Sequence, residues 1–201
     1  MASVDAHTFR TDPDFWYLVG ASEDVYLNVD SETGNYEFDL DSASERWLQQ
    51  IQPIIKKIVQ KDVKIRKHTN RDHHRLRFWN KALVCELKAI KDAPEQVSGV
   101  SKEFQRQWLA GFFDAEGSVQ LSGYKQSQPM LSIYSTSGAK IDIIIDLLGQ
   151  QFGIRAGKYL PKDRNVWQLF ITGRGSVATF ATEIPLRHPE KRESLARILQ
   201  A

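Results

Sequence analysis

The order of predicted elements repeats once along the chain, and this repetition restricts the possible folds more than any other feature. Gly20 lies in an apolar segment that runs into a strand-like alternation, and Gly111 does the same 91 positions later. Asp72 and Asp163, each in the turn of a second predicted hairpin, are also 91 positions apart. One offset that holds at both ends of a repeat indicates duplication or pseudo-symmetry, so we predict two units of the same structure.

The first unit is predicted to span residues 14–93 and to begin with a short apolar helix. Apolar and polar residues then alternate across 25–30 and 36–41, on either side of the turn sequence DSETG, which is typical of a hairpin with one buried face. A helix with an apolar stripe follows over 47–59. A second hairpin (DVKIRKH and RLRFW) and a helix over 81–91 complete the unit.

The same order returns in a second unit over residues 102–201, which ends with the helical segment PEKRESLARILQ. Residues 1–13 are interpreted as an N-terminal tail and residues 94–101 as a linker. Antiparallel hairpins with helices on one face leave the other sheet face free. We therefore predict an α+β fold of two pseudo-symmetric αββαββα units, whose antiparallel sheets form one long, concave, saddle-like surface.

Composition excludes several classes of protein. No apolar run approaches the roughly 18 residues of a membrane span, and the sequence MASVDAHTFRTD lacks the apolar core of a signal peptide. The single cysteine, Cys85, excludes an internal disulfide and a cysteine-based zinc cluster. With 41% apolar and 26% charged residues, we expect a soluble, intracellular globular protein with no membrane partner.

The net charge of +2 is too small to identify a partner, but the charges are unevenly distributed. Eight acidic residues and no Lys or Arg lie between Gly20 and Glu45, whereas eleven Lys or Arg and three acidic residues lie between Lys56 and Lys88. This distribution predicts two surfaces with different roles, of which the basic one is suited to phosphate. The alternative is two ordinary solvated faces.

The segment LAGFFDAEG, Leu109–Gly117, is the most informative stretch of the sequence. Ala110 and Gly111 are small enough to let two helices approach backbone to backbone, and Gly117 lets the chain leave a helix directly into a strand. The segment resembles the nine-residue signature of the LAGLIDADG homing endonucleases at its first, second, third, sixth, seventh and ninth positions. The resemblance extends over residues 14–184; the alternative is an apolar helix that ends in acids and glycine by chance.

The acid at the end of this motif has a readable chemistry. Glu116 projects from the helix end toward the sheet surface, where a twin helix would bring a second carboxylate alongside. Two carboxylates at such a short distance repel each other unless a divalent cation neutralises them. A carboxylate pair that holds Mg²⁺ against a phosphodiester is suited to metal-assisted hydrolysis. Because these acids do that work in the family, the resemblance implies that Glu116 is catalytic and binds Mg²⁺ or another divalent cation.

The twin motif in the first unit is shorter. The sequence YLVGASEDVYL matches the start of the signature at residues 18–20, including Gly20 at the predicted helix interface. With one residue deleted, the acid position falls on Asp24; without a deletion, it falls on Val25. We assign Asp24 as the second metal ligand and Glu23 as the other catalytic candidate. The alternative is that this half has lost its ligand.

Family members read DNA with the free faces of their hairpins, so the resemblance implies nucleic-acid contacts at those positions. Arg and Gln suit base edges, and Lys suits phosphates; the alternative for each is an ordinary solvated side chain. The predicted contacts form a basic stripe, a neutral polar face and a set in the last hairpin: Lys64, Arg66, His68, Arg75 and Arg77; Ser118, Gln120, Ser132 and Tyr134; Arg155, Lys158, Arg164 and Gln168. In the first hairpin, however, the free face carries Asp30, Glu37, Asp39 and Asp41, which oppose phosphate binding.

The resemblance thus implies a monomeric, site-specific, double-strand DNA endonuclease, whose usual family targets are intronless alleles. The alternative is a cleavage-deficient relative that binds DNA or structured RNA, such as a maturase-like splicing factor with intron RNA as its partner. The shortened first motif, the acidic hairpin and the absence of a lysine at the ends of the second strands (41–42 and 135–137) favour that alternative. A single surviving acid would leave a nicking enzyme.

Overall fold

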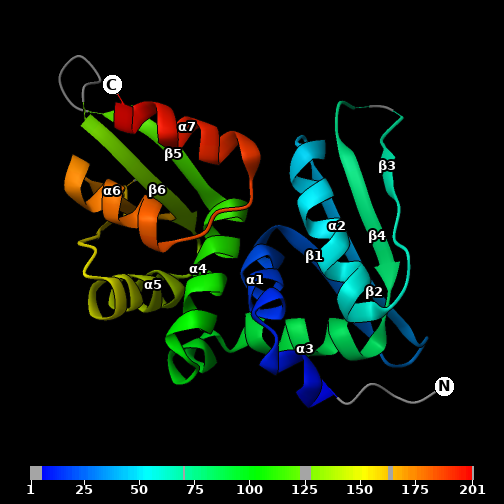
Figure 1. The fold of residues 1–201 in the computed structure, drawn as a ribbon. Helices are drawn as coiled ribbons and strands as arrows, with labels where there is room; N and C mark the ends of the chain where they lie inside the picture. Colours follow the sequence, from blue (N-terminus) through cyan, green and yellow to red (C-terminus); the bar gives the residue numbers. More distant parts are fainter. Residues whose placement is uncertain (1–5, 70, 123–127, 163–164, 201) are drawn as a thin grey trace.

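Two helices, α1 (Pro13–Ala21) and α4 (Lys102–Glu116), pack against each other at the centre of the molecule, with one antiparallel sheet on either side (Figure 1). This arrangement comes from a computed structural model, which describes residues 6–69, 71–122, 128–162 and 165–200. The predicted α+β fold of two pseudo-repeat units is confirmed.

The first unit contains one four-stranded sheet in the order β1-β2-β4-β3, in which all neighbours are antiparallel. Helices α2 and α3 pack against this sheet. Its elements are η1 (Ala6–Thr11), α1, η2 (Ser22–Asp24), β1 (Val25–Asp30), β2 (Asn35–Ser42), α2 (Glu45–Val59), β3 (Ile65–Lys67), β4 (His74–Trp79) and α3 (Lys81–Asp92).

The second unit repeats this topology in the order β5-β6-β8-β7. An additional C-terminal helix packs against β5. The elements are η3 (Pro94–Gly99), α4, β5 (Gly117–Ser122), β6 (Gln128–Ser135), α5 (Gly138–Phe152), β7 (Gly157–Tyr159), β8 (Trp167–Thr172), α6 (Arg174–Glu183) and α7 (Pro189–Gln200).

Side-chain caps fix where the first helices of each unit begin. Asp12 accepts a hydrogen bond from the backbone N–H of Asp14, and Pro13 occupies the first turn of α1. Ser101 caps α4 in the same way, through the N–H of Phe104. Ser44, Asn80 and Ser137 cap α2, α3 and α5. Within the described residues, no helix is both long and apolar enough to cross a membrane.

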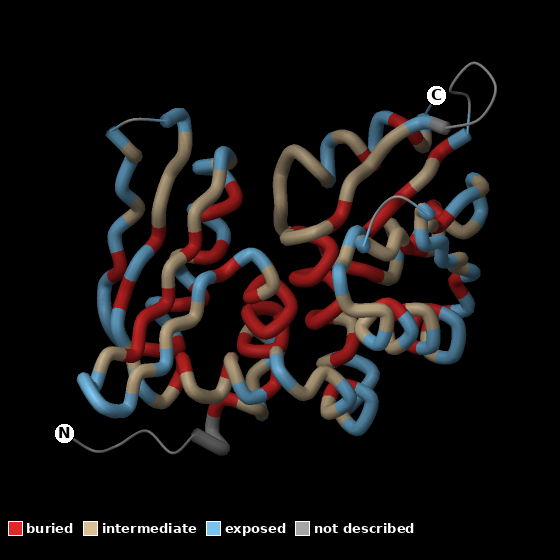
Figure 2. The backbone as a smooth tube through the Cα atoms, turned by 180° about the vertical axis from the view of Figure 1, so that it is seen from behind, coloured by how far each residue is buried: buried red, intermediate tan, exposed pale blue. Residues whose placement is uncertain are grey.

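The crossing of α1 and α4 depends on one glycine from each helix. A Cβ on Gly20 would lie 2.1 Å from the carbonyl oxygen of Trp108, and a Cβ on Gly111 would lie 2.0 Å from the carbonyl oxygen of Tyr17. The contacts are reciprocal, as a pseudo-twofold axis requires. Ala110, beside Gly111, is fully buried. Figure 2 shows that the buried backbone gathers around these two helices.

Gly111→Ala is expected to lower the free energy of unfolding by about 2 kcal/mol, because the new methyl group meets backbone atoms that cannot move independently. Gly149→Ala is the matched control: Gly149 lies in α5, and nothing is within 4 Å of its Cβ position. That change is expected to be neutral or mildly stabilising. Urea unfolding followed by circular dichroism measures both. Equal midpoints for the two variants would contradict the predicted close approach.

Two segments differ from the sequence-based expectation. Within the predicted tail, residues 6–11 form η1; the Phe9 side chain is buried, and Arg10 forms an ion pair with Glu86 of α3 at 2.9 Å. Within the predicted linker, residues 94–99 form η3, and Val97 is fully buried. Short 3₁₀ turns have no apolar periodicity that a sequence pattern could reveal.

Candidate active site and nucleic-acid interface

Helix α4 delivers the acid of the second motif to the sheet surface without a loop. Glu116 is the last residue of α4, and Gly117 is the first residue of β5. A Cβ on Gly117 would lie 2.5 Å from the Phe113 carbonyl oxygen and 2.5 Å from its ring, so a larger residue would displace this junction. Glu116 is therefore held at the point where helix and strand meet.

Helix α1 ends in the same way after a tighter turn. The 3₁₀ helix η2 covers Ser22–Asp24, and β1 begins at Val25. Asp24 thus directly precedes its strand, as Glu116 does. A 3₁₀ turn has fewer residues per turn than an α-helix, which accounts physically for the one-residue shortening of the first motif.

The carboxylates of the two helix ends interact. Burial raises the pKa of Glu116, and repulsion from Asp24 and Glu23 raises it further. The pKa of Asp24 is also raised, because the surrounding protein removes water from its carboxylate although the residue remains accessible, and because Asp41 repels it. A cluster of like charges with elevated pKa values is the electrostatic environment that a cation relieves.

Glu23 has a different environment from Asp24. Both of its carboxylate oxygens accept from Lys140 Nζ, at 2.8 and 2.9 Å, and both side chains are largely buried. Lys140 lies in the first turn of α5, in the other unit. A hollow of about 340 Å³ adjoins Glu23 and Glu116 and is lined by the end of β6.

Two lysines that sequence reasoning missed reach the ends of the central helices. Lys91 Nζ donates to the carbonyl oxygens of Ser22, Glu23 and Val25 at 2.5, 3.2 and 3.2 Å. Lys191 Nζ donates in the same way to the carbonyl oxygens of Phe113, Asp114 and Ala115, at 3.0, 2.6 and 3.3 Å. Cations at helix C-termini satisfy unpaired carbonyls and the helix dipole.

The two lysines are partly desolvated. Burial lowers the pKa of Lys191 to about 8 and lowers that of Lys91 below its usual value, against the attraction of the nearby carboxylates. They come from the last helices of the two units, α3 and α7. No local pattern in the sequence marks them, because each caps a helix that is distant along the chain.

The first acid of the second motif is structural. Asp114 is buried, and its Oδ2 accepts from the Tyr17 hydroxyl at 2.7 Å and from the backbone N–H groups of Arg187 and His188 at 2.7 and 3.1 Å. Burial raises its pKa to about 6. These bonds tie the start of α7, which carries Lys191, to the end of α4.

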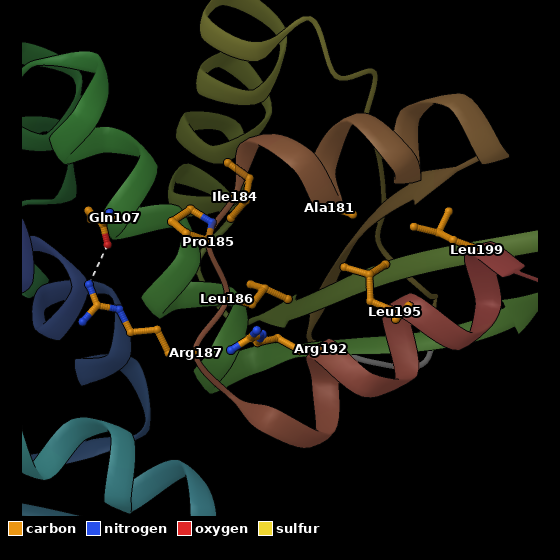
Figure 3. Close-up of a pocket in the computed structure, with 10 residues that line it drawn as sticks. Gln107, Ala181, Ile184, Pro185, Leu186, Arg187, Arg192, Leu195 and Leu199 are labelled. Carbon is orange, nitrogen blue, oxygen red and sulfur yellow. Dashed lines mark hydrogen bonds between the residues drawn. The ribbon is translucent and has the colours of Figure 1, made fainter.

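A separate hollow of about 610 Å³ lies between α4, α6 and α7 (Figure 3). Apolar side chains line it together with Gln107, Arg187 and Arg192, and Arg187 donates to Gln107 at 2.8 Å. None of its described lining residues carries a carboxylate, the side-chain group that usually binds Mg²⁺.

The strand residues of the two charged blocks lie on one sheet face, so for them the prediction of two separate surfaces is wrong. Strand β2 lies beside β4, with Asp39 opposite Arg77 and Asp41 opposite Arg75. Arg75 and Arg77 form ion pairs with the β2 carboxylates. Asp41 pairs with Arg71, and with His68 and His73 at 3.0 and 3.1 Å. The three free-face carboxylates of β2 therefore all have basic partners within the first unit.

The outer edge of this sheet carries the rest of the basic stripe. Arg66 lies opposite Arg75 and shares its face. Lys64 precedes β3 and His68 follows it. A hollow of about 180 Å³ is lined by Lys64, Arg66, Arg75, Arg77 and Trp79.

The second sheet has a neutral free face. Ser118 and Ser132 form a hydrogen bond of 2.9 Å between their hydroxyls, and Gln120 donates to Ser132 at 3.4 Å. Ser132 is fully buried within this network. Tyr134 lies opposite Gln168, so these two side chains share the face.

The last hairpin corrects one predicted contact. Lys158 lies opposite Leu169, a core residue, and forms an ion pair with Asp142 of α5. It therefore belongs to the helix-covered side, whereas the next residue, Tyr159, lies opposite Gln168 on the free face. Arg155 is exposed in the segment before β7. Arg164 lies outside the described residues.

Comparisons with known proteins agree with this geometry. Residues 103–185 match the model of the LAGLIDADG-like domain. Homing endonuclease I-ApeI of Aeropyrum pernix is 29% identical over 116 residues, which cover 53% of this chain and 46% of that protein. The matched part thus spans less than half of the relative's length.

Solved structures of similar fold cover nearly the whole chain. I-DmoI in complex with DNA and Mn has a TM-score of 0.66 at 20% identity, covering 86% of this chain and 96% of that one; other I-DmoI structures hold DNA with Mg or Ca. I-WcaI bound to its DNA recognition sequence has a TM-score of 0.68 at 16% identity, covering 91% and 85%. The N-terminal LAGLIDADG domain of DUF199/WhiA has a TM-score of 0.62 at 15% identity and covers 98% of each chain. The second unit thus matches the LAGLIDADG-like domain, and the paired glycine helices and duplicated sheets give the whole chain the fold of I-DmoI.

Proposed function

We propose that the chain is a site-specific endonuclease that cuts both strands of a DNA duplex with the help of a divalent cation. The observation that carries the proposal is the meeting of Asp24 and Glu116 at the ends of two packed helices, between two sheets with free polar faces. Relatives that cut or bind DNA, such as I-ApeI, I-DmoI and I-WcaI, support it. One copy carries both acids, so a monomer suffices.

Asp24 and Glu116 fit a divalent cation. Carboxylate oxygens are the ligands that Mg²⁺ and Mn²⁺ prefer, and their mutual repulsion favours a bound positive charge. Glu23 is less suitable, because Lys140 already occupies both of its oxygens. A cation bound there would polarise the scissile phosphate and lower the pKa of a bound water.

The lysines hold this arrangement in place. Lys91 and Lys191 each bind three carbonyl oxygens at a helix end, which fixes the backbone directly beside Asp24 and Glu116. Their positive charge also attracts the two carboxylates and partly offsets the desolvation that raises their pKa values. Both carboxylates therefore remain better ligands near neutral pH than burial alone would allow.

The relative importance of Asp24 and Glu23 can be tested by substitution. Asp24→Asn is expected to reduce double-strand cleavage by about a hundredfold or more, because it removes a metal ligand. Glu23→Gln makes the same change of net charge one residue away. It is expected to reduce cleavage by less than about fivefold, because it removes no metal ligand and keeps the side-chain shape beside Lys140. The rate of cleavage of a plasmid that carries a target site, identified by selection from a library of randomised duplexes, measures both effects. Full activity in Asp24→Asn together with loss in Glu23→Gln would assign the twin ligand to Glu23.

A direct test of the function incubates the protein and Mg²⁺ with a library of randomised DNA duplexes and sequences the broken ends. We expect double-strand breaks at one long, related set of sites. Enrichment of a bound site without breaks would instead identify a DNA-binding relative, and preference for structured RNA over duplex DNA would identify a maturase-like protein. Single-strand nicks would show that only one carboxylate acts.

A further inference from the structure

The carboxylates of β2 lie on the free sheet face, yet the neighbouring arginines cover them. The side chains of Glu37 and Asp39 are only 6% and 11% exposed, whereas those of Arg77 and Arg75 are 40% and 35% exposed. The carboxylates therefore lie close to the sheet, and the guanidinium groups cover them on the side that would meet DNA. Burying these carboxylates without such partners would be costly.

The pairing uses only part of each guanidinium. Arg75 donates Nε and Nη2 to the two oxygens of Asp39, with the Nε bond at 2.6 Å. Arg77 pairs with Glu37 through Nε. An arginine has five N–H donors in a planar fork. Both side chains therefore keep N–H groups on Nη1 and Nη2 for a ligand, with the fork held in one orientation.

Arg77 is held from a second side. Its guanidinium carbon lies 5.0 Å from the centroid of the Trp79 ring. Trp79 itself is 55% exposed. A cation over an indole face is stabilised by the ring quadrupole. Held between Glu37 and Trp79, the Arg77 side chain loses less rotamer freedom on binding than a free arginine, which favours affinity and specificity together.

The ion-paired arginines, Arg75 and Arg77, are suited to a different contact with DNA from the basic residues beside them. Lys64 and Arg66 line the same hollow as Arg75, Arg77 and Trp79. A salt-bridged arginine adds little to the counterion release that drives phosphate binding. Its free fork instead matches the O6 and N7 acceptors of guanine in the major groove, the commonest specific contact between proteins and DNA.

We propose that Arg75 and Arg77 read guanine bases in the half-site bound by the first sheet, and that Asp39 and Glu37 are positioning residues that hold the forks toward the bases. This inference rests on the proposed function and specifies the sequence that this function recognises. The second sheet offers a contrast, because its free face has Ser118, Gln120 and Ser132 in a neutral network. Among the described strand residues, the paired arginines lie on the first sheet, so we expect the two guanine positions in the half-site that this sheet binds.

The test is selection of bound duplexes from a randomised library by the full chain, with Ca²⁺ in place of Mg²⁺ to slow cleavage. The wild-type chain is expected to select guanine at two positions of one half-site. Arg75→Lys and Arg77→Lys keep the charge and lose the fork, so each is expected to reduce the preference for guanine at one position by about tenfold. The other half-site should be unchanged.

The positioning role has its own readout. Asp39→Asn and Glu37→Gln are expected to weaken the guanine preference while steepening the salt dependence of binding to unrelated DNA by about one unit, because each frees a positive charge for phosphates. Asp142→Asn is the matched control: it breaks the Lys158 ion pair on the helix-covered side with the same change of net charge. It should not alter base preference.

The outcomes separate the inference from the proposed function. A wild-type chain that selects no duplex sequence contradicts the proposed function. A wild-type chain that selects a site, with guanine preference retained in both lysine variants, overturns base reading by these arginines. Unchanged preference and salt slope in Asp39→Asn and Glu37→Gln overturn the positioning role, and lower affinity with unchanged preference indicates a structural role only.

Discussion

Glu116→Gln is expected to reduce double-strand cleavage on the order of a thousandfold while leaving DNA affinity unchanged or improved. Removal of a metal ligand forfeits several kcal/mol of charge stabilisation in the transition state, and each 1.36 kcal/mol corresponds to about tenfold in rate. Affinity is preserved because glutamine has nearly the same shape and lacks the negative charge that repels phosphates.

The same variant gives a readout that does not depend on activity. Burial and the neighbouring acids raise the pKa of Glu116, so its ionised form is destabilising in the protein without metal. Glu116→Gln is therefore expected to unfold at higher urea than the wild type in the presence of EDTA. Addition of Mn²⁺ should stabilise the wild type and have a smaller effect on the variant, because the variant binds the cation more weakly.

Glu103→Gln is the matched control for both measurements. Glu103 lies in the first turn of the same helix, and it contacts Arg106 and Gln107 rather than the acids at the other end. It should cut DNA at the wild-type rate and respond to Mn²⁺ as the wild type does. Wild-type cleavage by Glu116→Gln would show that the metal ligand of this unit is another residue.

The element order could be predicted from the sequence because the relevant signals are local. Apolar periodicity, helix caps and turn residues act within a few positions, and the final helix over 189–200 was bounded by them correctly. The repeat then supplied the pairing of α1 with α4, which is a long-range contact, through the glycines of each copy. The 3₁₀ segments η1 and η3 have no such signature.

The residues of the candidate site also differ in whether a local sequence signal marks them. Glu116 and the candidates Asp24 and Glu23 lie inside one contiguous motif or its copy, so their proximity follows from the packing of two helices. Lys91 and Lys191 cap helices that are distant along the chain, and only the tertiary fold places them there. The β2 carboxylates were recognised as exposed acids, but their arginine partners depend on the register between β2 and β4, across an intervening helix and strand.

A second expected result concerns pH and two buried groups with opposite effects on stability. Burial raises the pKa of Asp114 from 3.8 to about 6, so the folded protein binds this proton more tightly than the unfolded chain. Its contribution to the free energy of unfolding is therefore greatest below about pH 4 and falls as the pH rises to about 6. A shift of this size corresponds to about 3 kcal/mol.

His188 acts in the other direction. Burial and the charge of Lys191 lower its pKa from 6.5 to about 4, against the attraction of Glu190. The folded protein disfavours the protonated ring, which stacks on Trp47 with centroids 5.2 Å apart. Its contribution is fully present above about pH 6.5 and is lost as the pH falls toward 4, by about 3 kcal/mol.

The two contributions oppose each other between pH 4 and 6, so the wild-type stability is expected to change little across this range on their account. Asp114→Asn removes one of them, and its free energy of unfolding should then rise with pH relative to the wild type. His188→Phe keeps an aromatic ring against Trp47 and removes the other, so its stability should fall with pH relative to the wild type. The raised pKa values of Asp24 and Glu116 are common to all three proteins and cancel in these differences.

Urea unfolding at several pH values between 4 and 7, in EDTA and at constant ionic strength, measures the three curves. Both substitutions also cost stability that does not depend on pH, because Asp114 accepts three hydrogen bonds between α1, α4 and the start of α7. The test therefore compares how the free energy of unfolding changes with pH in the three proteins, rather than its value at a single pH. Parallel curves for the wild type and Asp114→Asn would mean that Asp114 titrates alike in both states, which requires those three bonds to compensate fully for its burial.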